Sequence, residues 1–224
     1  GFYAYENGKQ QAALIAPAPS ARPDRVWISG ARPAFAAAVR ERVRSLGGRL
    51  DESQSPQDGA LCIVTPLGED ASTCAAREEL DPACTVAIDA LLGLDKRRTL
   101  MTSPLTSPAM REAAHGLFAA DGVPVSVIRD SAGLVAQRVL AHIVNIGCDI
   151  AQQGIATPED IDRAVTLGLG YPKGPLALGD TIGAATVLAI LENLQACYGD
   201  PRYRPSPWLR RRALLGASLL TPES

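Results

Sequence analysis

The chain has 224 residues, of which 46% are hydrophobic and 21% charged, and its formal net charge is −2 at pH 7. That length allows one large domain or two of roughly 100 residues each, and the composition is typical of a globular protein with a buried core. The small net charge gives no electrostatic reason to expect nucleic acid or an anionic membrane as a partner. No apolar run reaches the ~18–20 residues that a membrane span needs.

Five scattered cysteines never occur in a Cys-x-x-Cys spacing; they are Cys62, Cys74, Cys84, Cys148 and Cys197. Zinc sites usually show cysteines paired two to four residues apart, so this spacing argues against a metal centre. We expect the cysteines to be small buried side chains, free in a reducing environment, and therefore expect a cytoplasmic protein.

Residues 1–24 are predicted to be the end of a preceding domain followed by a linker, because the Ala/Pro-rich run of residues 16–20 favours neither helix nor sheet. The chain also begins without methionine, in the middle of a pattern. We therefore expect it to be a fragment of a longer protein.

Short apolar segments alternate with helix-like segments over residues 25–130. The expected strands are residues 25–29, 60–65, 85–88, 99–102 and 123–128, and the expected helices are residues 34–46, 71–80 and 108–120. Strands that alternate with helices of ~10–13 residues predict an α/β domain with a mostly parallel sheet.

Helical periodicity replaces this pattern over residues 131–224. Residues 134–153 and 181–198 each carry large side chains at spacings of 4, 3 and 4, as one helix face requires. These are Val139, Ile143, Ile146 and Ile150 in the first segment, and Val187, Leu191, Leu194 and Tyr198 in the second. We expect both faces to be buried, against a surface that the sequence does not identify. The domain boundary is placed near Asp130.

Other helix boundaries are marked locally. The run of residues 157–160 has an N-cap threonine, a proline at the first helical position and two acids, and residues 207–215 are predicted to form the last helix. The Gly/Pro-rich run of residues 167–180 predicts a rigid corner between two helices, or else a surface shaped for a ligand or another subunit. Residues 210–212, all arginine, are expected on a solvated helix face, with phosphate contact as the alternative.

The turn after the first strand is where a dinucleotide-binding fold carries Gly-x-Gly-x-x-Gly. Here Gly30 keeps the first position, but Arg32 stands at the second and Phe35 at the third. We expect the arginine to occupy space that a pyrophosphate would use, and the phenyl ring to hold helix and strand apart. Asp51 follows at roughly the spacing of the acid that meets a ribose hydroxyl. These substitutions predict that the fold is retained and the cofactor site lost.

No residue pattern indicates a general base. The two histidines, His115 and His142, lie inside predicted helices with no sign of a carboxylate nearby. Ser29, Ser103 and Ser131 have no neighbouring base either. We therefore predict no catalytic residue in this chain.

Four long motifs resemble the 3-hydroxyacyl-CoA dehydrogenase family. They are residues 130–139 (DSAGLVAQRV), 154–162 (GIATPEDID), 168–175 (GLGYPKGP) and 199–207 (GDPRYRPSP). The resemblance covers roughly residues 123–215, and residues 1–5 (GFYAY) resemble the close of an earlier helical domain. It implies a degenerate Rossmann-like domain followed by a helical C-terminal-type domain, the trailing half of a long, duplicated oxidoreductase.

The same resemblance implies where the chemistry lies. The family's catalytic histidine, in a His-Phe-Phe-Asn-Pro run, would fall in residues 85–93, which contain no histidine, and Gln137 stands at the family's asparagine position. The resemblance assigns NAD, the acyl-CoA substrate and oxidation of 3-hydroxyacyl-CoA to 3-oxoacyl-CoA, a reaction of fatty-acid β-oxidation, to the intact protein. No NAD or metal is expected to bind to this chain alone.

Three roles for this chain follow as hypotheses. The leading one is structural: completing the substrate cleft or forming oligomers, with an N-terminal catalytic half of the same chain and further subunits of a homo-oligomer as partners. The alternative is a second NAD- or acyl-CoA-binding module with rearranged site residues. The third is a module that recruits other pathway enzymes, for which no motif argues.

Overall fold

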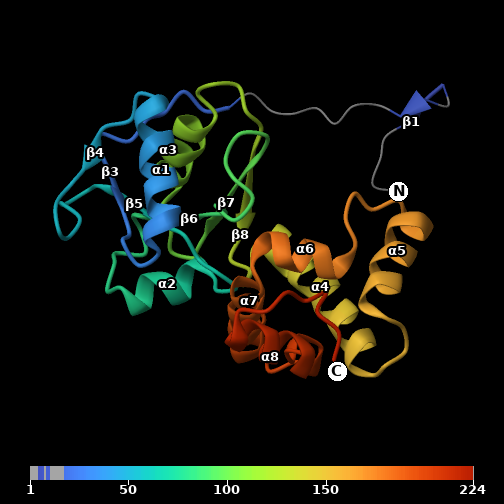
Figure 1. Ribbon diagram of the computed structural model, residues 1–224. Helices are drawn as coiled ribbons and strands as arrows, with labels where there is room; N and C mark the ends of the chain where they lie inside the picture. The colour runs from blue at the N-terminus through green and yellow to red at the C-terminus, as the bar shows by residue number, and fades with distance from the viewer. Residues whose placement is uncertain (1–4, 8, 11–17, 224) are drawn as a thin grey trace.

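The computed structural model describes residues 5–7, 9–10 and 18–223. Within these ranges the chain forms eight α-helices, one 3-10 helix, a six-stranded sheet and a small ribbon that pairs Tyr5–Glu6 (β1) with Lys9–Gln10 (β2) (Figure 1). The resemblance noted for residues 1–5 and the start of the predicted linker lie largely outside the described residues.

The large sheet runs in the order β4-β3-β5-β6-β7-β8. Its strands are Val26–Ile28 (β3), Leu50–Asp51 (β4), Leu61–Val64 (β5), Thr85–Ile88 (β6), Arg98–Thr102 (β7) and Val125–Arg129 (β8). Neighbouring strands are parallel except β6 and β7. Only residues 89–97 connect those two strands, too few for the dozen or more that a parallel crossover needs. The Rossmann-like parallel sheet is thus confirmed, with one antiparallel pair.

Helices cover both faces of this sheet. Pro33–Ser45 (α1) and Pro108–Phe118 (α3) lie on one face, and Ala71–Arg77 (α2) lies on the other (Figure 1). Each of these helices falls within two or three residues of its predicted bounds, because local signals such as the Ser107 cap of α3 set its ends.

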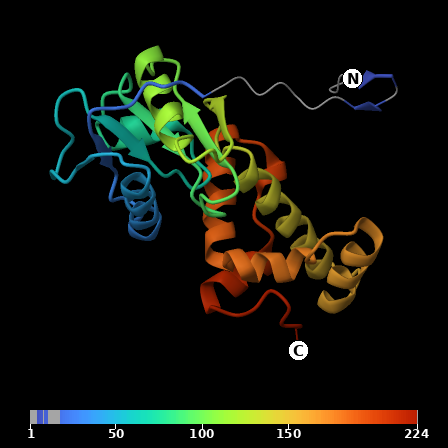
Figure 2. The same cartoon turned by 90° about the horizontal axis from the view of Figure 1, so that it is seen from above.

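The helical part follows directly after β8. Its helices are Ala136–Gln152 (α4), Pro158–Leu169 (α5), Pro175–Ile182 (α6), Ala184–Tyr198 (α7) and Pro207–Leu215 (α8), with Pro201–Tyr203 as a 3-10 helix. They enclose their own core, and α5 lies at the end farthest from the sheet (Figures 1 and 2). The predicted cap at Thr157 is confirmed, since its hydroxyl accepts a hydrogen bond from the Asp160 amide at 3.2 Å.

The predicted corner at residues 167–180 is partly wrong, because it contains the helix α6. The carboxylate of Asp162, on α5, accepts hydrogen bonds from the Leu176 and Ala177 amides, both at 2.8 Å. This cap comes from another helix, and sequence periodicity does not reveal such a cap. The helix expected over residues 181–198 therefore starts at Ala184, after a break at Gly183.

The rest of the described chain does not bury the large apolar face of α4 at two of its four positions, so the expected burial there requires another protein part. Val139 is 52% exposed and Ile146 is 48% exposed. The buried face instead carries Gln137, Ala141, Val144, Asn145, Gly147, Cys148 and Ala151. Small residues occupy this face because α4 packs closely against α6, where a Cβ at Gly147 would lie 2.8 Å from Pro175. For α7 the expectation is confirmed at its first three positions, which are fully buried, whereas Tyr198 is 44% exposed.

The described residues contain no single helix that is both long and apolar enough to cross a membrane. Only α6 and α7 together reach that length and hydropathy, and their axes are bent by 95°.

Candidate functional site

The turn after β3 places its three predicted site residues at the start of α1. Gly30 is exposed, and a Cβ added there would meet nothing within 4 Å. The Arg32 guanidinium lies 3.3 Å from a carboxylate oxygen of Glu69, in the loop after β5. Phe35 is half-buried and packs against both the sheet core and the helical core. The turn therefore serves as a contact between the two parts of the molecule.

Two largely buried carboxylates line the same turn. Glu69 and Glu78 have side chains only 12% and 17% exposed. Glu78 accepts a hydrogen bond from the Ser29 hydroxyl, and Arg77 pairs with both glutamates. A diphosphate placed at this turn would have to compete with both carboxylates for Arg32 and Arg77, and it would also meet the bulk of the Arg32 side chain. These residues do not fit the diphosphate of a dinucleotide.

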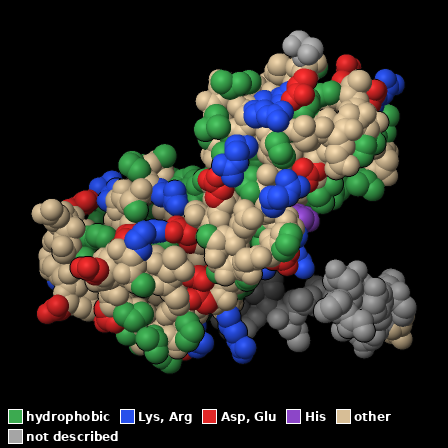
Figure 3. Space-filling view, turned by 90° about the horizontal axis from the view of Figure 1, so that it is seen from below, with side chains coloured by type: hydrophobic (Ala, Val, Ile, Leu, Met, Phe, Trp, Pro, Cys, Tyr) green, Lys and Arg blue, Asp and Glu red, His purple; other side chains and the backbone are tan. Residues whose placement is uncertain are grey.

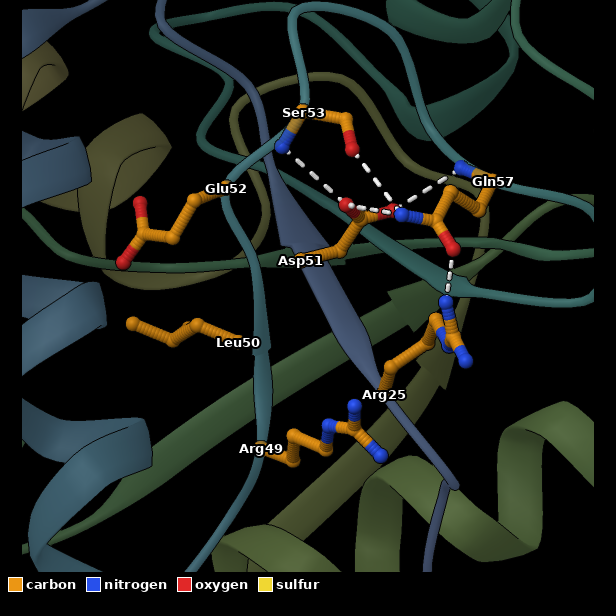
Figure 4. Close-up of a pocket in the computed structure, with 7 residues that line it drawn as sticks. All are labelled: Arg25, Arg49, Leu50, Asp51, Glu52, Ser53 and Gln57. Carbon is orange, nitrogen blue, oxygen red and sulfur yellow. Dashed lines mark hydrogen bonds between the residues drawn. The ribbon is translucent and has the colours of Figure 1, made fainter.

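Asp51 ends β4 at the edge of the sheet and lines a cavity of about 270 Å³ (Figure 4). Its carboxylate accepts hydrogen bonds from the backbone amides of Ser53 at 3.1 Å and Gln57 at 2.8 Å. These bonds, the one from Gln57 foremost, hold the pKa of Asp51 below its usual value. The carboxylate at the spacing of a ribose-binding acid thus binds amides of its own loop.

The end of β6 holds a buried acid where the resemblance placed the family's histidine region. Asp89 directly follows β6, and its Oδ1 accepts hydrogen bonds from Gln137 Nε2 at 3.0 Å and from the Leu91 amide at 3.1 Å. Burial raises the pKa of Asp89, although the hydrogen bond from Gln137 opposes this. Asp89 also lines a second cavity of about 270 Å³ beside Thr99 and Ala136.

Gln137 connects the sheet to the helical part. Its side chain is fully buried, donates to the Pro66 carbonyl at 3.0 Å as well as to Asp89, and accepts from the Gly68 amide at 2.8 Å. Asn193 of α7 donates to the Leu67 carbonyl at 2.8 Å. The loop after β5 is therefore held by α4 and α7, and Gln137 acts here as a structural contact.

The Gly/Pro-rich motif of the helical part also has a structural explanation. A Cβ at Gly174 would lie 2.4 Å from the Asp162 Cα, so only glycine permits this approach of α6 to α5. Asp180 accepts hydrogen bonds from the Ser218 hydroxyl and the Leu219 amide. The motif fixes the helices relative to one another.

The remaining candidates lie apart from these groups. His142 faces Tyr203 edge-on with ring centroids 6.4 Å apart, and its buried Nδ1 has no partner among the described residues. Arg210 pairs with Glu192 at 2.8 Å, and Arg211 pairs with Glu223 at 3.2 Å. Arg212 is buried with its guanidinium 3.2 Å from the centre of the Trp208 ring. The expected solvated face thus holds for the first two arginines only.

The cysteines are all free. Burial of Cys62, Cys74 and Cys148 confirms the expectation for these three and raises each thiol pKa to about 12. Cys197 is exposed, so the expectation is wrong there. No three His, Cys, Asp or Glu side chains in the described ranges lie close enough to hold a metal ion. The cytoplasmic location stays a prediction.

Sequence reasoning missed the three acids of this region, Glu69, Glu78 and Asp89. Glu69 and Glu78 reach the turn from distant segments, which no spacing rule could indicate. Asp89 carried a usable signal: it directly follows a fully buried strand, at the carboxyl end where α/β folds place functional groups.

Comparisons with known proteins agree with the resemblance. The sequence model of the 3-hydroxyacyl-CoA dehydrogenase C-terminal domain matches residues 133–218. The chain is 39% identical over 158 residues to the 3-hydroxyadipyl-CoA dehydrogenase of Escherichia coli K12. The aligned residues make up 70% of this chain and 32% of that protein. The resemblance to the family is thereby confirmed.

Solved structures agree as well. A 3-hydroxybutyryl-CoA dehydrogenase from Escherichia coli K12 superposes with a TM-score of 0.61 at 37% identity, covering 68% of this chain and 31% of that one. An (S)-3-hydroxybutyryl-CoA dehydrogenase from Ralstonia eutropha superposes with a TM-score of 0.68 at 23% identity, covering 90% and 71%, and supports the fold alone. The chain spans about a third of the length of the first curated relative it matches.

Proposed function

The helical part of this chain is a 3-hydroxyacyl-CoA dehydrogenase C-terminal domain, and from that premise we propose that the chain is the non-catalytic half of such an oxidoreductase. In the intact protein, an N-terminal half would oxidise 3-hydroxyacyl-CoA to 3-oxoacyl-CoA with NAD. The half described here would complete the fold and the assembly around that catalytic half.

Two features of the sheet support a non-catalytic role. At the turn after β3, Glu69 and Glu78 already engage Arg32 and Arg77, so these guanidinium groups are not free to bind a diphosphate. The acid at the end of β6, Asp89, has one oxygen engaged by Gln137 and by the backbone. Hydride transfer needs a seated cofactor and a base free to take a proton, and this arrangement favours neither.

The observation that carries the proposal is an apolar stripe, defined by the N-cap residue Val135 and by Val139 and Ile146 of α4. These side chains are 55%, 52% and 48% exposed, although α4 lies in a well-packed helical core. Hydrophobic side chains also reach the surface of both lobes in Figure 3. Exposed apolar residues that repeat along one helix face are typical of a surface that packs against another protein part.

Sedimentation velocity would test this proposal on the chain alone and mixed with a separately produced catalytic half. We expect self-association or complex formation that the double variant Val139→Glu/Ile146→Glu abolishes, because burying two carboxylates in an apolar contact is costly. Leu105→Glu is the control, since Leu105 is 68% exposed outside the helical part. A wild-type chain that stays monomeric and ignores the catalytic half would refute the proposal.

The cavity beside Asp51, which Arg25 and Arg49 also line, supports a second candidate, an NAD- or acyl-CoA-binding module with rearranged residues. Trp27 would report dinucleotide binding, because its indole N–H donates to the Ser53 carbonyl, at 3.1 Å, beside Asp51. Titration with NADH should quench Trp27 emission with submillimolar affinity if this candidate holds. Quenching that is absent at saturating NADH, or unchanged when Asp51 is replaced by alanine, would remove it.

A further inference from the structure

A cavity of about 530 Å³ lies at the opposite edge of the sheet from the turn after β3. It is bounded by the linker at Pro19, by α3 at Arg111 and His115, and by β8 at Ile128 and Arg129. Three strands separate β8 from β3, so this cavity shares no residue with the cofactor turn. Its volume lies in the range of small-molecule sites.

The charges around this cavity are mainly positive. Arg111, Arg129 and His115 line it, and Glu112 is the one acidic residue in the lining. The Arg129 guanidinium forms no hydrogen bond or ion pair with the described residues, and that of Arg111 lies 4.0 Å from Glu112, at the outer limit of an ion pair. Two guanidinium groups therefore remain available to an anion.

The edge strand β8 adds backbone groups. The Thr102 hydroxyl of β7 donates to the Ile128 carbonyl at 3.4 Å, so this carbonyl faces β7. Backbone groups alternate in direction along a strand, so the N–H and C=O groups of Val127 and Arg129 point to the open edge. They offer hydrogen bonds to a molecule in the cavity.

The linker wall of the cavity is fixed by close packing. A Cβ at Gly116 of α3 would lie 2.2 Å from the Ala21 carbonyl oxygen and 2.6 Å from that of Pro19. The linker backbone thus rests directly on α3, and Pro19 closes one side. The cavity is consequently formed by three segments of the chain and not by a single loop.

We propose that this cavity binds the phosphate group of a small phosphate ester. Guanidinium groups pair with phosphate oxygens through two parallel hydrogen bonds, and the imidazole supplies a further donor. A phosphate monoester has three terminal oxygens and a charge of about −1.5 to −2 at pH 7, so it pairs with two guanidinium groups more strongly than a singly charged carboxylate does. Pro19, Val127 and Ile128 supply the apolar surface for the organic part of the ester.

Isothermal titration calorimetry of the full chain at low salt tests the proposal with phenyl phosphate, benzoate and phenol as probes. We expect phenyl phosphate to bind more tightly than benzoate, and phenol not to bind. Arg111→Gln and Arg129→Gln should each weaken phenyl phosphate roughly tenfold or more, as the loss of a hydrogen bond to a charged group predicts. Arg163→Gln, an exposed arginine on α5, is the matched control and should leave the affinity unchanged.

Three results would overturn the proposal. One is the absence of binding heat with phenyl phosphate up to about 10 mM, a concentration at which a site with a dissociation constant of ~1 mM would be mostly filled. Another is equal affinity for benzoate, which would remove the assignment to phosphate. The last is wild-type affinity in the Arg111→Gln/Arg129→Gln double variant. Circular dichroism of each variant shows that the fold is intact, since both arginines are exposed.

Discussion

The carboxyl ends of β3 and β5 lie side by side in the sheet, but the glycines that follow them differ in the space available for a side chain. After β3, Gly30 stands exposed with free space around its Cα. After β5, Gly68 has a φ of +75°, and a Cβ there would lie 2.4 Å from the Ile190 carbonyl oxygen of α7. The first turn tolerates side chains, and the second does not.

This contrast shows where the fold depends on its backbone. In a dinucleotide-binding domain, the turn after the first strand must leave room for a diphosphate. Here Arg32 and two glutamates fill that region, while the loop after β5 is locked into α4 and α7 by Gln137 and Asn193. The backbone conformation is therefore most tightly constrained where the loop after β5 contacts the helical part.

Alanine at the two glycines gives the largest expected difference. Gly68→Ala combines a strained left-handed residue with overlap against α7, and we expect a loss of about 3 kcal/mol or more in the free energy of unfolding. Gly30→Ala should change it by less than about 0.5 kcal/mol, as surface substitutions usually do. Urea unfolding followed by circular dichroism measures both. Similar losses for the two variants would contradict the contrast.

Removing the hydrogen bonds of Gln137 should have the next largest effect. Gln137→Leu leaves the Gly68 amide, the Pro66 carbonyl and the Asp89 carboxylate without their partner in a buried region. We expect a loss of about 2–3 kcal/mol, the cost of unsatisfied buried groups. Gln153→Leu, at an exposed position just after α4, is the control. Equal midpoints for the two variants in urea would show that the contact is dispensable.

A smaller difference is expected between two helix caps. Asp162→Ala removes both hydrogen bonds that the carboxylate accepts from amides at the start of α6, and should cost about 1–2 kcal/mol. Asp70→Ala should cost less, because amides at the N-terminus of α2 also donate hydrogen bonds to the carboxylate of Asp130. Thermal unfolding of the two variants, side by side, measures the order. A larger loss for Asp70→Ala would show that the second cap does not compensate.

The sequence was most informative where structure is set locally. The strand 85–88, the cap at Thr157 and the substituted glycine positions at Arg32 and Phe35 all depend on neighbours within a few residues. These features could be predicted because propensity, capping and turn chemistry act over that range.

The features that escaped prediction depend on distant partners. The buried face of α4 is chosen by the close approach of Gly147 to Pro175, which favours small residues over the larger stripe that periodicity selects. Gln137 was recognised at the family's asparagine position, but its partners lie 48 to 71 residues away in the chain. Asp89 was overlooked although it directly follows a buried strand, and its contact with Gln137 could not be predicted because 48 residues separate the two.

The smallest expected effect is a pH dependence of stability that comes from the buried acid Asp89 at the end of β6. The open turn after β3 is not expected to contribute to it. The raised pKa means that the folded protein holds the Asp89 proton more tightly than the unfolded chain, whose aspartates titrate near ~3.9. Stability from this group is therefore greatest below ~pH 4 and falls as the pH rises through the raised pKa, by less than about 1.4 kcal/mol per pH unit. Asp89→Asn should flatten this decline in urea unfolding between pH 4 and pH 7, while Asp58→Asn, an exposed control, should not. A decline that persists in Asp89→Asn would assign the pH dependence to other groups.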